Sequence, residues 1–352
     1  MNKRVAYLDI AKFIAIFSMV ICHTMVSHLF DSNVHAFHMP IFFIVSGWCF
    51  NLKKHNKFKS FSLSRIKTLI VPYFFWGVVL FVGWELFYAF YSPEKVLSLG
   101  DYFYSIFYNN SMFSSFTTVQ WFLTCMFFAQ IIGWCVLKVC KEKFSPVVLS
   151  IIFLFGIGWG YSFILPFRLP LSFDVALSSS GFYLVGWLIP NCVKPKLNEK
   201  TKKILLSPVT FLIEAGLGLL ASYINGYVNM RTISFGNPLL FYFSAIMLSL
   251  AIIHFSYLVE KWTTKGNIFY DNILFLGKNT LPILMLNQVF IQFAKLIAGR
   301  YGFYVNLSMD TKYILWFGFS LVLMIVFIPI IKLINRYIPF SVGRKYANKK
   351  SA

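Results

Sequence analysis

The sequence of 352 residues is poor in charge, because Asp, Glu, Lys and Arg make up only 12% of it. A soluble domain carries about 25% charged and about 45–50% apolar residues. The shortage of charge excludes an ordinary cytosolic enzyme. The hydrophobic fraction of 58% excludes a disordered chain, which needs low hydrophobicity and high charge density. With 42 Phe and a mean hydropathy of +0.70, the composition indicates a polytopic membrane protein.

Acidic residues are the scarcest charged class, with 12 Asp and Glu against 32 Lys and Arg, and the net charge is +20. In a soluble chain this excess would favour nucleic-acid binding. In a membrane protein, positive charge instead marks the cytoplasmic side and attracts anionic lipid. We therefore expect membrane lipid, and no nucleic acid, among the partners.

Several sequence signatures are missing as well. The six cysteines form no Cys-x-x-Cys pair, so neither a zinc site nor a disulfide framework is predicted. No glycine-rich motif supports an ATP or NAD site. Asp9 and Lys12 interrupt the first apolar run, and no small-residue cleavage site follows it. We interpret this run as a retained first helix and not as a signal peptide.

The apolar runs are long enough to cross a membrane, which takes about 20 helical residues. They predict an all-α polytopic bundle of about ten transmembrane helices in one domain, residues 1–340, followed by a short basic tail, residues 341–352. The predicted spans are residues 5–27, 37–52, 68–91, 119–138, 146–165, 175–192, 207–224, 238–259, 279–298 and 312–334. In this topology 25 of the 32 Lys and Arg lie on the side of the N-terminus and six on the other. This bias predicts both termini cytoplasmic, in a multi-pass protein of the cell membrane.

The first predicted helix carries two ionisable groups on one face. Lys12 and His23 are eleven residues apart, which is about 20° beyond three full helical turns and about 16 Å of rise. Asp9 precedes Lys12 by three residues, close enough to form an ion pair with it. Ionisable groups at membrane depth usually face a cavity or a partner, so this face is a candidate functional surface.

Four of the six histidines cluster between residues 23 and 38, namely His23, His28, His35 and His38. The first two predicted spans form a hairpin that places these histidines at the outer rim. Neutral imidazole is a suitable general base at physiological pH. The alternative, that the histidines are interfacial and satisfied by water, is favoured for His28 and His35. No matching acid or cysteine set is expected beside them, so no metal is predicted.

For three further residues, the sequence allows two interpretations each, one functional and one structural. The buried acids Glu85 and Glu214 could orient a histidine or pair with Lys12, or they could form structural pairs or snorkel. Trp121 begins the fourth predicted span, where it belongs either to the aromatic belt at the membrane surface or to an aromatic wall for a sugar ring.

Residues 53–67 hold six positive charges, among them Lys53, Lys54, Arg65 and Lys67. A solvated cytoplasmic loop is the default interpretation. A clamp for phosphate groups is the alternative, because Arg and Lys suit phosphate geometry.

Five motifs resemble those of acyltransferase family 3 membrane proteins, particularly the branch close to fucose 4-O-acetylases and polysaccharide O-acetyltransferases. The most specific are YLDIAKFIAIFSMVICH, residues 7–23, and HAFHMPIFFIVSGWCF, residues 35–50. The supporting ones are RIKTLIVPYFFWG, residues 65–77, QWFL, residues 120–123, and FLGKNTLPILML, residues 275–286. They occur in the family's order and cover essentially the whole chain.

The resemblance implies an O-acyltransferase that takes acetyl from acetyl-CoA in the cytoplasm. The implied acceptor is a carbohydrate hydroxyl, in a capsular or cell-wall polysaccharide unit that is free or lipid-linked, with polysaccharide-assembly proteins as further partners. It implies that His23 is the essential histidine and Lys12 the motif's cation. Arg65 and Lys67, with Lys53 and Lys54 beside them, stand where the family has a basic cluster for CoA.

The sequence departs from the family pattern at three points. Lys12 stands where many members have Arg, Thr68 replaces the second Arg of an Arg-x-x-Arg pair, and Asn287-Gln288 stand where relatives often have a late histidine. Lysine lacks the bidentate fork of arginine.

The expected chemistry is removal of the hydroxyl proton by His23, with His38 as orienter or second proton carrier. A covalent acetyl-imidazole on His23 is the alternative. Lys12 would hold negative charge on the donor or stabilise the bundle through Asp9, and Trp121, Glu85 and His35 are candidates for acceptor binding. A transporter or flippase for a lipid-linked glycan is the competing function, since buried charges and a basic inner face are expected there too.

Overall fold

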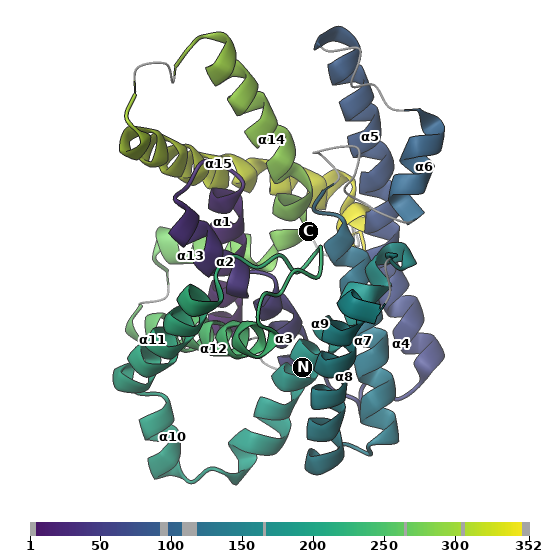
Figure 1. Cartoon of the computed structure of the whole chain (residues 1–352), viewed down its shortest axis with the longest axis vertical. Coiled ribbons are helices and arrows are strands. Elements are labelled where there is room, and N and C mark those ends of the chain that lie inside the picture. The colour runs from purple at the N-terminus through teal and green to yellow at the C-terminus, as the bar shows by residue number, and fades with distance from the viewer. Residues whose placement is uncertain are drawn as a thin grey trace.

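The computed structural model describes residues 5–91, 98–107, 118–164, 167–263, 266–303 and 307–346, and in these ranges it is helical without strands (Figure 1). The predicted all-α class is confirmed. The helices are α1 Ala6–Cys22, α2 His28–Phe37, α3 Pro40–Trp48, α4 Phe58–Arg65, α5 Val71–Tyr91, α6 Leu99–Phe107, α7 Trp121–Val139, α8 Phe144–Ile164, α9 Phe173–Leu188, α10 Glu199–Leu205, α11 Pro208–Asn225, α12 Pro238–Trp262, α13 Ile268–Lys278, α14 Thr280–Arg300 and α15 Met309–Tyr337.

Within the described ranges, eight helical segments are long and apolar enough to cross a membrane. They coincide with the third to tenth predicted spans. The segments are Phe58–Ala89, Trp121–Val139, Phe144–Tyr161, Pro170–Lys196, Pro208–Asn225, Pro238–Trp262, Thr280–Arg300 and Met309–Tyr337. The chain is therefore a multi-pass membrane protein.

The first two predicted spans differ from the prediction. Helix α1 has 17 residues, and the second span, predicted at residues 37–52, is reduced to the nine-residue α3, with Phe37 as the last residue of the preceding α2. The helix breaks at His38 and Met39 because Pro40, the first residue of α3, has no backbone N–H to continue it. Nine residues rise only about 14 Å, less than half of the hydrocarbon core.

The basic stretch before the third span is largely helical, where the sequence analysis placed a loop. Helix α4 continues through a π-helical turn, Ile66–Ile70, into α5. Arg65 and Lys67 therefore lie on a helix and point in different directions. A π-helical turn of this kind often marks a functional position.

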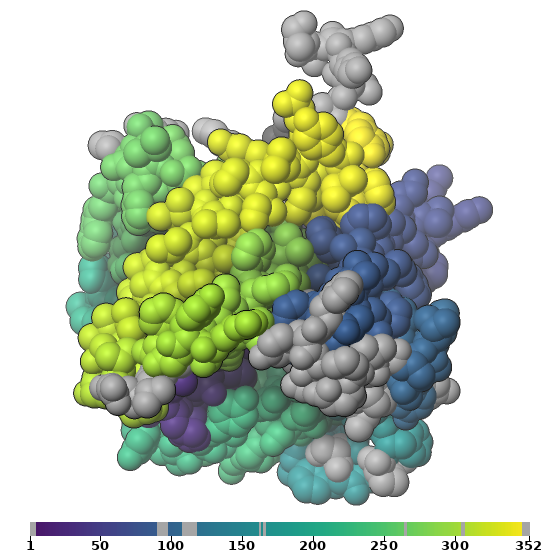
Figure 2. Space-filling view, turned by 90° about the horizontal axis from the view of Figure 1, so that it is seen from above, coloured from purple at the N-terminus to yellow at the C-terminus, as the bar shows by residue number. Residues whose placement is uncertain are grey.

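Helix α1 lies inside the bundle and packs against α12 and α13, while α3 packs against α9, which also contacts α7 and α8 (Figure 1). Glycines allow the backbones of neighbouring helices to approach closely at two of these contacts. A Cβ on Gly47 would lie 1.8 Å from the backbone oxygen of Tyr183, and a Cβ on Gly277 would lie 1.9 Å from that of Asp9. Small residues let transmembrane backbones approach in this way. Figure 2 shows α14 and α15 as a band across one face, next to α5.

Candidate functional site

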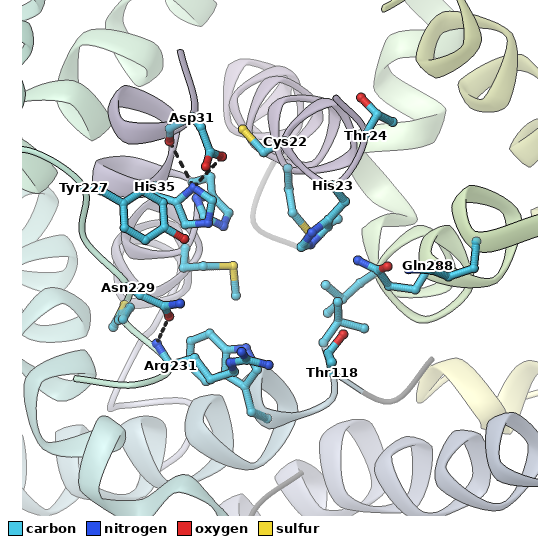
Figure 3. A pocket seen from close by; sticks show the side chains of 18 of the residues that line it. Cys22, His23, Thr24, Asp31, His35, Thr118, Tyr227, Asn229, Arg231 and Gln288 are labelled. Carbon is cyan, nitrogen blue, oxygen red and sulfur yellow. Dashed lines mark hydrogen bonds and ion pairs between the residues drawn. The ribbon is translucent and has the colours of Figure 1, made fainter. Parts of the chain in front are cut away.

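A cavity of about 410 Å³ lies where α1, α2, α7 and α14 meet the loop between α11 and α12 (Figure 3). We name it the outer cavity, after the side that the charge distribution predicts. It is lined by Met19, Cys22, His23, Thr24, Asp31, His35, His38, Met39, Thr118, Val119, Trp121, Tyr227, Asn229, Met230, Arg231, Leu284, Gln288, Gln292 and Lys295. Three of the four clustered histidines are thus brought together, and His28 is exposed outside the lining.

His23 and His38 both stand at helix ends. His23 caps the C-terminus of α1, and its backbone oxygen accepts a hydrogen bond of 2.9 Å from the Lys295 Nζ. His38 caps α2 and is buried, and its Nδ1 lies 2.9 Å from the Val34 carbonyl oxygen. Because a carbonyl only accepts, Nδ1 of His38 carries the proton and Nε2 keeps its lone pair. The site therefore contains an imidazole nitrogen able to accept a proton.

The third histidine belongs to a group formed by Cys22, Asp31 and His35, whose ligand-type atoms lie within 4.8 Å of one another. The expectation that no acid or cysteine stands near these histidines is wrong. His35 Nδ1 lies 3.0 Å from the Asp31 backbone oxygen and 3.0 Å from its Oδ1 (Figure 3). Because both neighbours are acceptors, this nitrogen carries a proton and is not presented as a metal ligand.

The wall opposite α1 comes from Trp121 and from the loop of residues 226–237. Trp121 is only 7% exposed and lines the cavity, so it is not a residue of the outer aromatic belt. Tyr227, Asn229 and Arg231 line the cavity from the loop, and Figure 3 shows them across from Gln288. Burial raises the pKa of the Tyr227 hydroxyl, so it stays protonated and can donate a hydrogen bond. Aromatic rings beside hydrogen-bonding groups suit a polar ring-shaped ligand.

A second cavity, of about 390 Å³, lies at the other end of α1, and we name it the inner cavity. Lys12 and Arg65 supply its cations, and the predicted pair is confirmed, since Lys12 Nζ lies 2.7 Å from Asp9 Oδ1. Burial and the charges of Arg65 and Lys54 lower the pKa of His55, another lining residue, so it is uncharged at neutral pH.

A smaller cavity of about 180 Å³, the middle cavity, lies between these two. It shares Met39 and Leu284 with the outer cavity, and Phe42, Ser46 and Gln130 with the inner one. Gln130 Nε2 donates to Ser46 Oγ at 2.9 Å, and Arg65 Nη1 lies 3.5 Å from Gln130 Oε1. Three neighbouring cavities thus lie in a row between the surroundings of Lys12 and those of His23.

Other predicted residues lie elsewhere. Lys53 and Lys54 are exposed in the turn before α4 and line none of the three cavities. Lys67 lines a separate hollow of about 630 Å³ together with Arg344 and Lys345. Glu85, in α5, is also outside the lining of the three cavities.

Glu214 pairs with a histidine, which is one of the alternatives that the sequence left open. Its Oε2 lies 3.0 Å from His254 Nδ1, in another pocket. It does not pair with Lys12, whose partner is Asp9.

Several residues of the outer cavity were not predicted from the sequence. Arg231 and Lys295 were counted only among the six positive charges of the outer side, and Tyr227 and Asp31 were not singled out. Asp31 could have been found, because it precedes His35 by one helical turn, a spacing at which helical side chains meet. No local signal places Arg231 beside a histidine about two hundred residues earlier.

Comparison with known proteins found a family match that covers most of the chain. The model of one family, described as an acyltransferase domain of the family 3 type, matches residues 5–333. No curated protein and no solved structure matches the chain. The matched segment includes every residue that lines the three cavities, and it ends before the C-terminal residues of the Lys67 hollow.

Proposed function

Because this chain belongs to acyltransferase family 3, we propose that it transfers acetyl from cytoplasmic acetyl-CoA to a hydroxyl of a cell-surface or lipid-linked carbohydrate. The observation that carries the proposal is the row of three adjacent cavities. It runs from the cations of the inner cavity to the histidines of the outer one.

The donor enters from the inner cavity. Arg65 is the group best suited to the CoA phosphates, because its guanidinium can bind them bidentately. Lys12 adds positive charge, and Lys53 and Lys54 attract the donor from the exposed turn. The pantetheine arm, which is uncharged, extends through the middle cavity, where Ser46 can bond its amides. Lys12 and His23 are separated by about 16 Å of helix, so a long arm is needed to reach from one to the other.

The acceptor occupies the outer cavity, with its ring against Trp121. His23 takes the hydroxyl proton as the hydroxyl oxygen attacks the thioester carbonyl carbon. The carbon–sulfur bond then breaks, and the CoA thiolate takes a proton from the imidazolium. His38, through its unprotonated Nε2, is the second proton carrier. The products are an acetylated sugar and free CoA, and the surrounding apolar residues limit hydrolysis by water.

The test uses purified protein in lipid nanodiscs with radiolabelled acetyl-CoA, and measures acetyl transfer and hydrolysis. We expect His23→Ala to lower turnover by about 10²- to 10⁴-fold, the usual contribution of a general base. The matched control is His28→Ala, which removes an exposed histidine outside the cavity lining.

The two alternatives give different results in this assay. A transporter or flippase would show no turnover of acetyl-CoA in the wild type. A covalent mechanism would leave label on His23 when the acceptor is withheld. A His23→Ala protein that inserts normally and retains full O-acetylation, read by NMR of the surface glycan, contradicts the assignment.

A further inference from the structure

The charged side chains of the outer cavity do not balance. Among the described residues that line it, Arg231 and Lys295 are the cations and Asp31 is the only carboxylate. That carboxylate already faces His35, since Asp31 Oδ1 lies 3.0 Å from the His35 Nδ1. Lys295 donates to a backbone carbonyl, that of His23, and not to an acid. The histidine end of the site therefore carries an excess of positive charge.

Arg231 differs in this respect from the arginine beside it. Arg168 forms a buried ion pair with Asp174, in which its Nε and Nη2 face the two carboxylate oxygens. In the described part of the chain, no ion pair joins the half-buried Arg231 to an acidic residue. Withdrawing a cation from water without an anion is costly, so such a group is normally kept for a ligand.

The loop that carries Arg231 is built to hold it in place. Asn229 and Ser234 exchange two backbone hydrogen bonds, of 2.8 and 3.0 Å. The Arg231 N–H donates to Asn229 Oδ1 at 3.1 Å, and the Arg231 carbonyl accepts from Arg168 Nη2 at 2.8 Å. The side chains of Val228, Met230, Ile233 and Phe235 are all buried. The backbone of Arg231 is therefore fixed on both sides while its side chain reaches into the cavity (Figure 3).

We propose that the acceptor is an anionic sugar, whose carboxylate or phosphate is bound by Arg231 in a cavity to which Lys295 adds positive charge. This inference rests on the proposed function, because it concerns the acceptor of the same reaction. Arginine binds both anions through two parallel hydrogen bonds, so the chemistry is shared. The anion fixes the sugar on the loop side of the cavity, and a neighbouring hydroxyl then faces His23 on the α1 side.

Transfer assays with matched acceptors test the proposal. Protein in nanodiscs receives radiolabelled acetyl-CoA and one of three oligosaccharide pools: one containing hexuronic acid, the same pool after carboxyl reduction, and a phosphorylated pool. We expect one of the anionic pools to be acetylated with a kcat/KM about 10- to 100-fold above that of the neutral, carboxyl-reduced pool. This is the stabilisation that hydrogen bonds to a charged group provide. Preference for the uronate pool identifies carboxylate, and preference for the phosphorylated pool identifies phosphate. Equal or faster acetylation of the reduced pool overturns the proposal.

Variants of Arg231 separate recognition from folding. Arg231→Gln should lower kcat/KM for the anionic pool by about 10- to 100-fold, much more than for the neutral pool, so that the preference is lost. Arg231→Lys should retain part of the preference. Arg300→Gln, which removes an exposed cation outside the lining, should change neither value. If Arg231→Gln lowers both values equally, the residue acts in structure or chemistry and the proposal is wrong.

Binding gives an answer that does not require the natural acceptor. Glucuronate, glucose 6-phosphate and glucose are titrated into wild type and Arg231→Gln by calorimetry without acetyl-CoA. One of the two anions should bind at least about 10-fold more tightly than glucose, and only in the wild type. If neither anion does so, the inference fails. Hydrolysis of acetyl-CoA, measured separately on the same protein preparations, tests the proposed function.

Discussion

Replacing Lys12 with Met separates two roles that this cation could have, stabilising the bundle through Asp9 or acting on the donor. The two side chains form an ion pair of 2.7 Å, and Asp9 is only 3% exposed. At an effective dielectric constant of about 20, a pair at that distance attracts by about 6 kcal/mol before desolvation. Lys12→Met therefore leaves a buried carboxylate without its closest cation, which is strongly destabilising.

Protonation of the carboxyl group sets an upper limit on this loss. Protonating a carboxyl group of reference pKa about 3.9 costs about 4 kcal/mol at pH 7 and about 1.5 kcal/mol at pH 5. In the variant, the Asp9 carboxylate can always be protonated instead of remaining charged and unpaired with Lys12. Lys12→Met should therefore lower the free energy of unfolding by about 2–4 kcal/mol at pH 7. The loss should shrink by up to about 1.4 kcal/mol for each pH unit as the pH falls.

The assay compares denaturation of Lys12→Met, Lys12→Arg and the double variant Asp9→Asn/Lys12→Met at pH 7 and pH 5, with acetyl-CoA turnover measured in parallel. Lys12→Arg should be close to wild type in stability, and the double variant should recover most of it. If the double variant also recovers turnover, Lys12 serves the bundle only. If Lys12→Met shows no loss at pH 7, or a loss independent of pH, the reasoning from the ion pair is refuted.

Three further predictions follow from the cavities and the packing. Arg65→Gln should raise the KM for acetyl-CoA by about 10-fold or more, because a charge-assisted hydrogen bond is lost, whereas Lys53→Gln, in the exposed turn, should leave KM within about twofold. Trp121→Ala should lower kcat/KM for the acceptor by about 10-fold while acceptor-independent hydrolysis of acetyl-CoA persists, which steady-state kinetics will show. Gly47→Ala should lower the yield of folded protein in detergent by size-exclusion chromatography, because its Cβ would lie 1.8 Å from a backbone oxygen of α9. Gly83→Ala should not lower it, because no described residue outside the surrounding stretch of helix comes within 4 Å of a Cβ at that position.

What the sequence predicts well is what depends on local geometry. Helical periodicity is a property of neighbouring residues, so it places Lys12 and His23 on one face, and the structure confirms that both line the row of cavities. The same is true of the pair between Asp9 and Lys12. Hydropathy likewise predicts eight of its ten spans correctly, because length and apolarity are sufficient to define them.

Predictions fail where local conformation changes the direction of side chains. Arg65 and Lys67 are separated by one residue in a stretch that was interpreted as a loop, and one phosphate clamp could then have included both. On a helix, residues two apart point to different sides. Arg65 consequently lines the inner cavity and Lys67 a different hollow. The break before Pro40 likewise shortens the second span, which hydropathy alone treats as continuous.

The two ends of the site are built differently, and this difference has a consequence for specificity. Arg65, Ser46 and Gln130 at the inner end all lie on helices, α4, α3 and α7, and Gln130 forms hydrogen bonds with the other two. The outer end takes Tyr227, Asn229 and Arg231 from a loop, and loops tolerate substitution better than the elements they connect. Substitutions in residues 226–237 can therefore alter the outer cavity, the proposed acceptor site, while the helices that line the inner cavity stay in place. On this reasoning, a chain with the same helices and a different loop would keep acetyl-CoA as its donor and transfer the acetyl group to a different sugar.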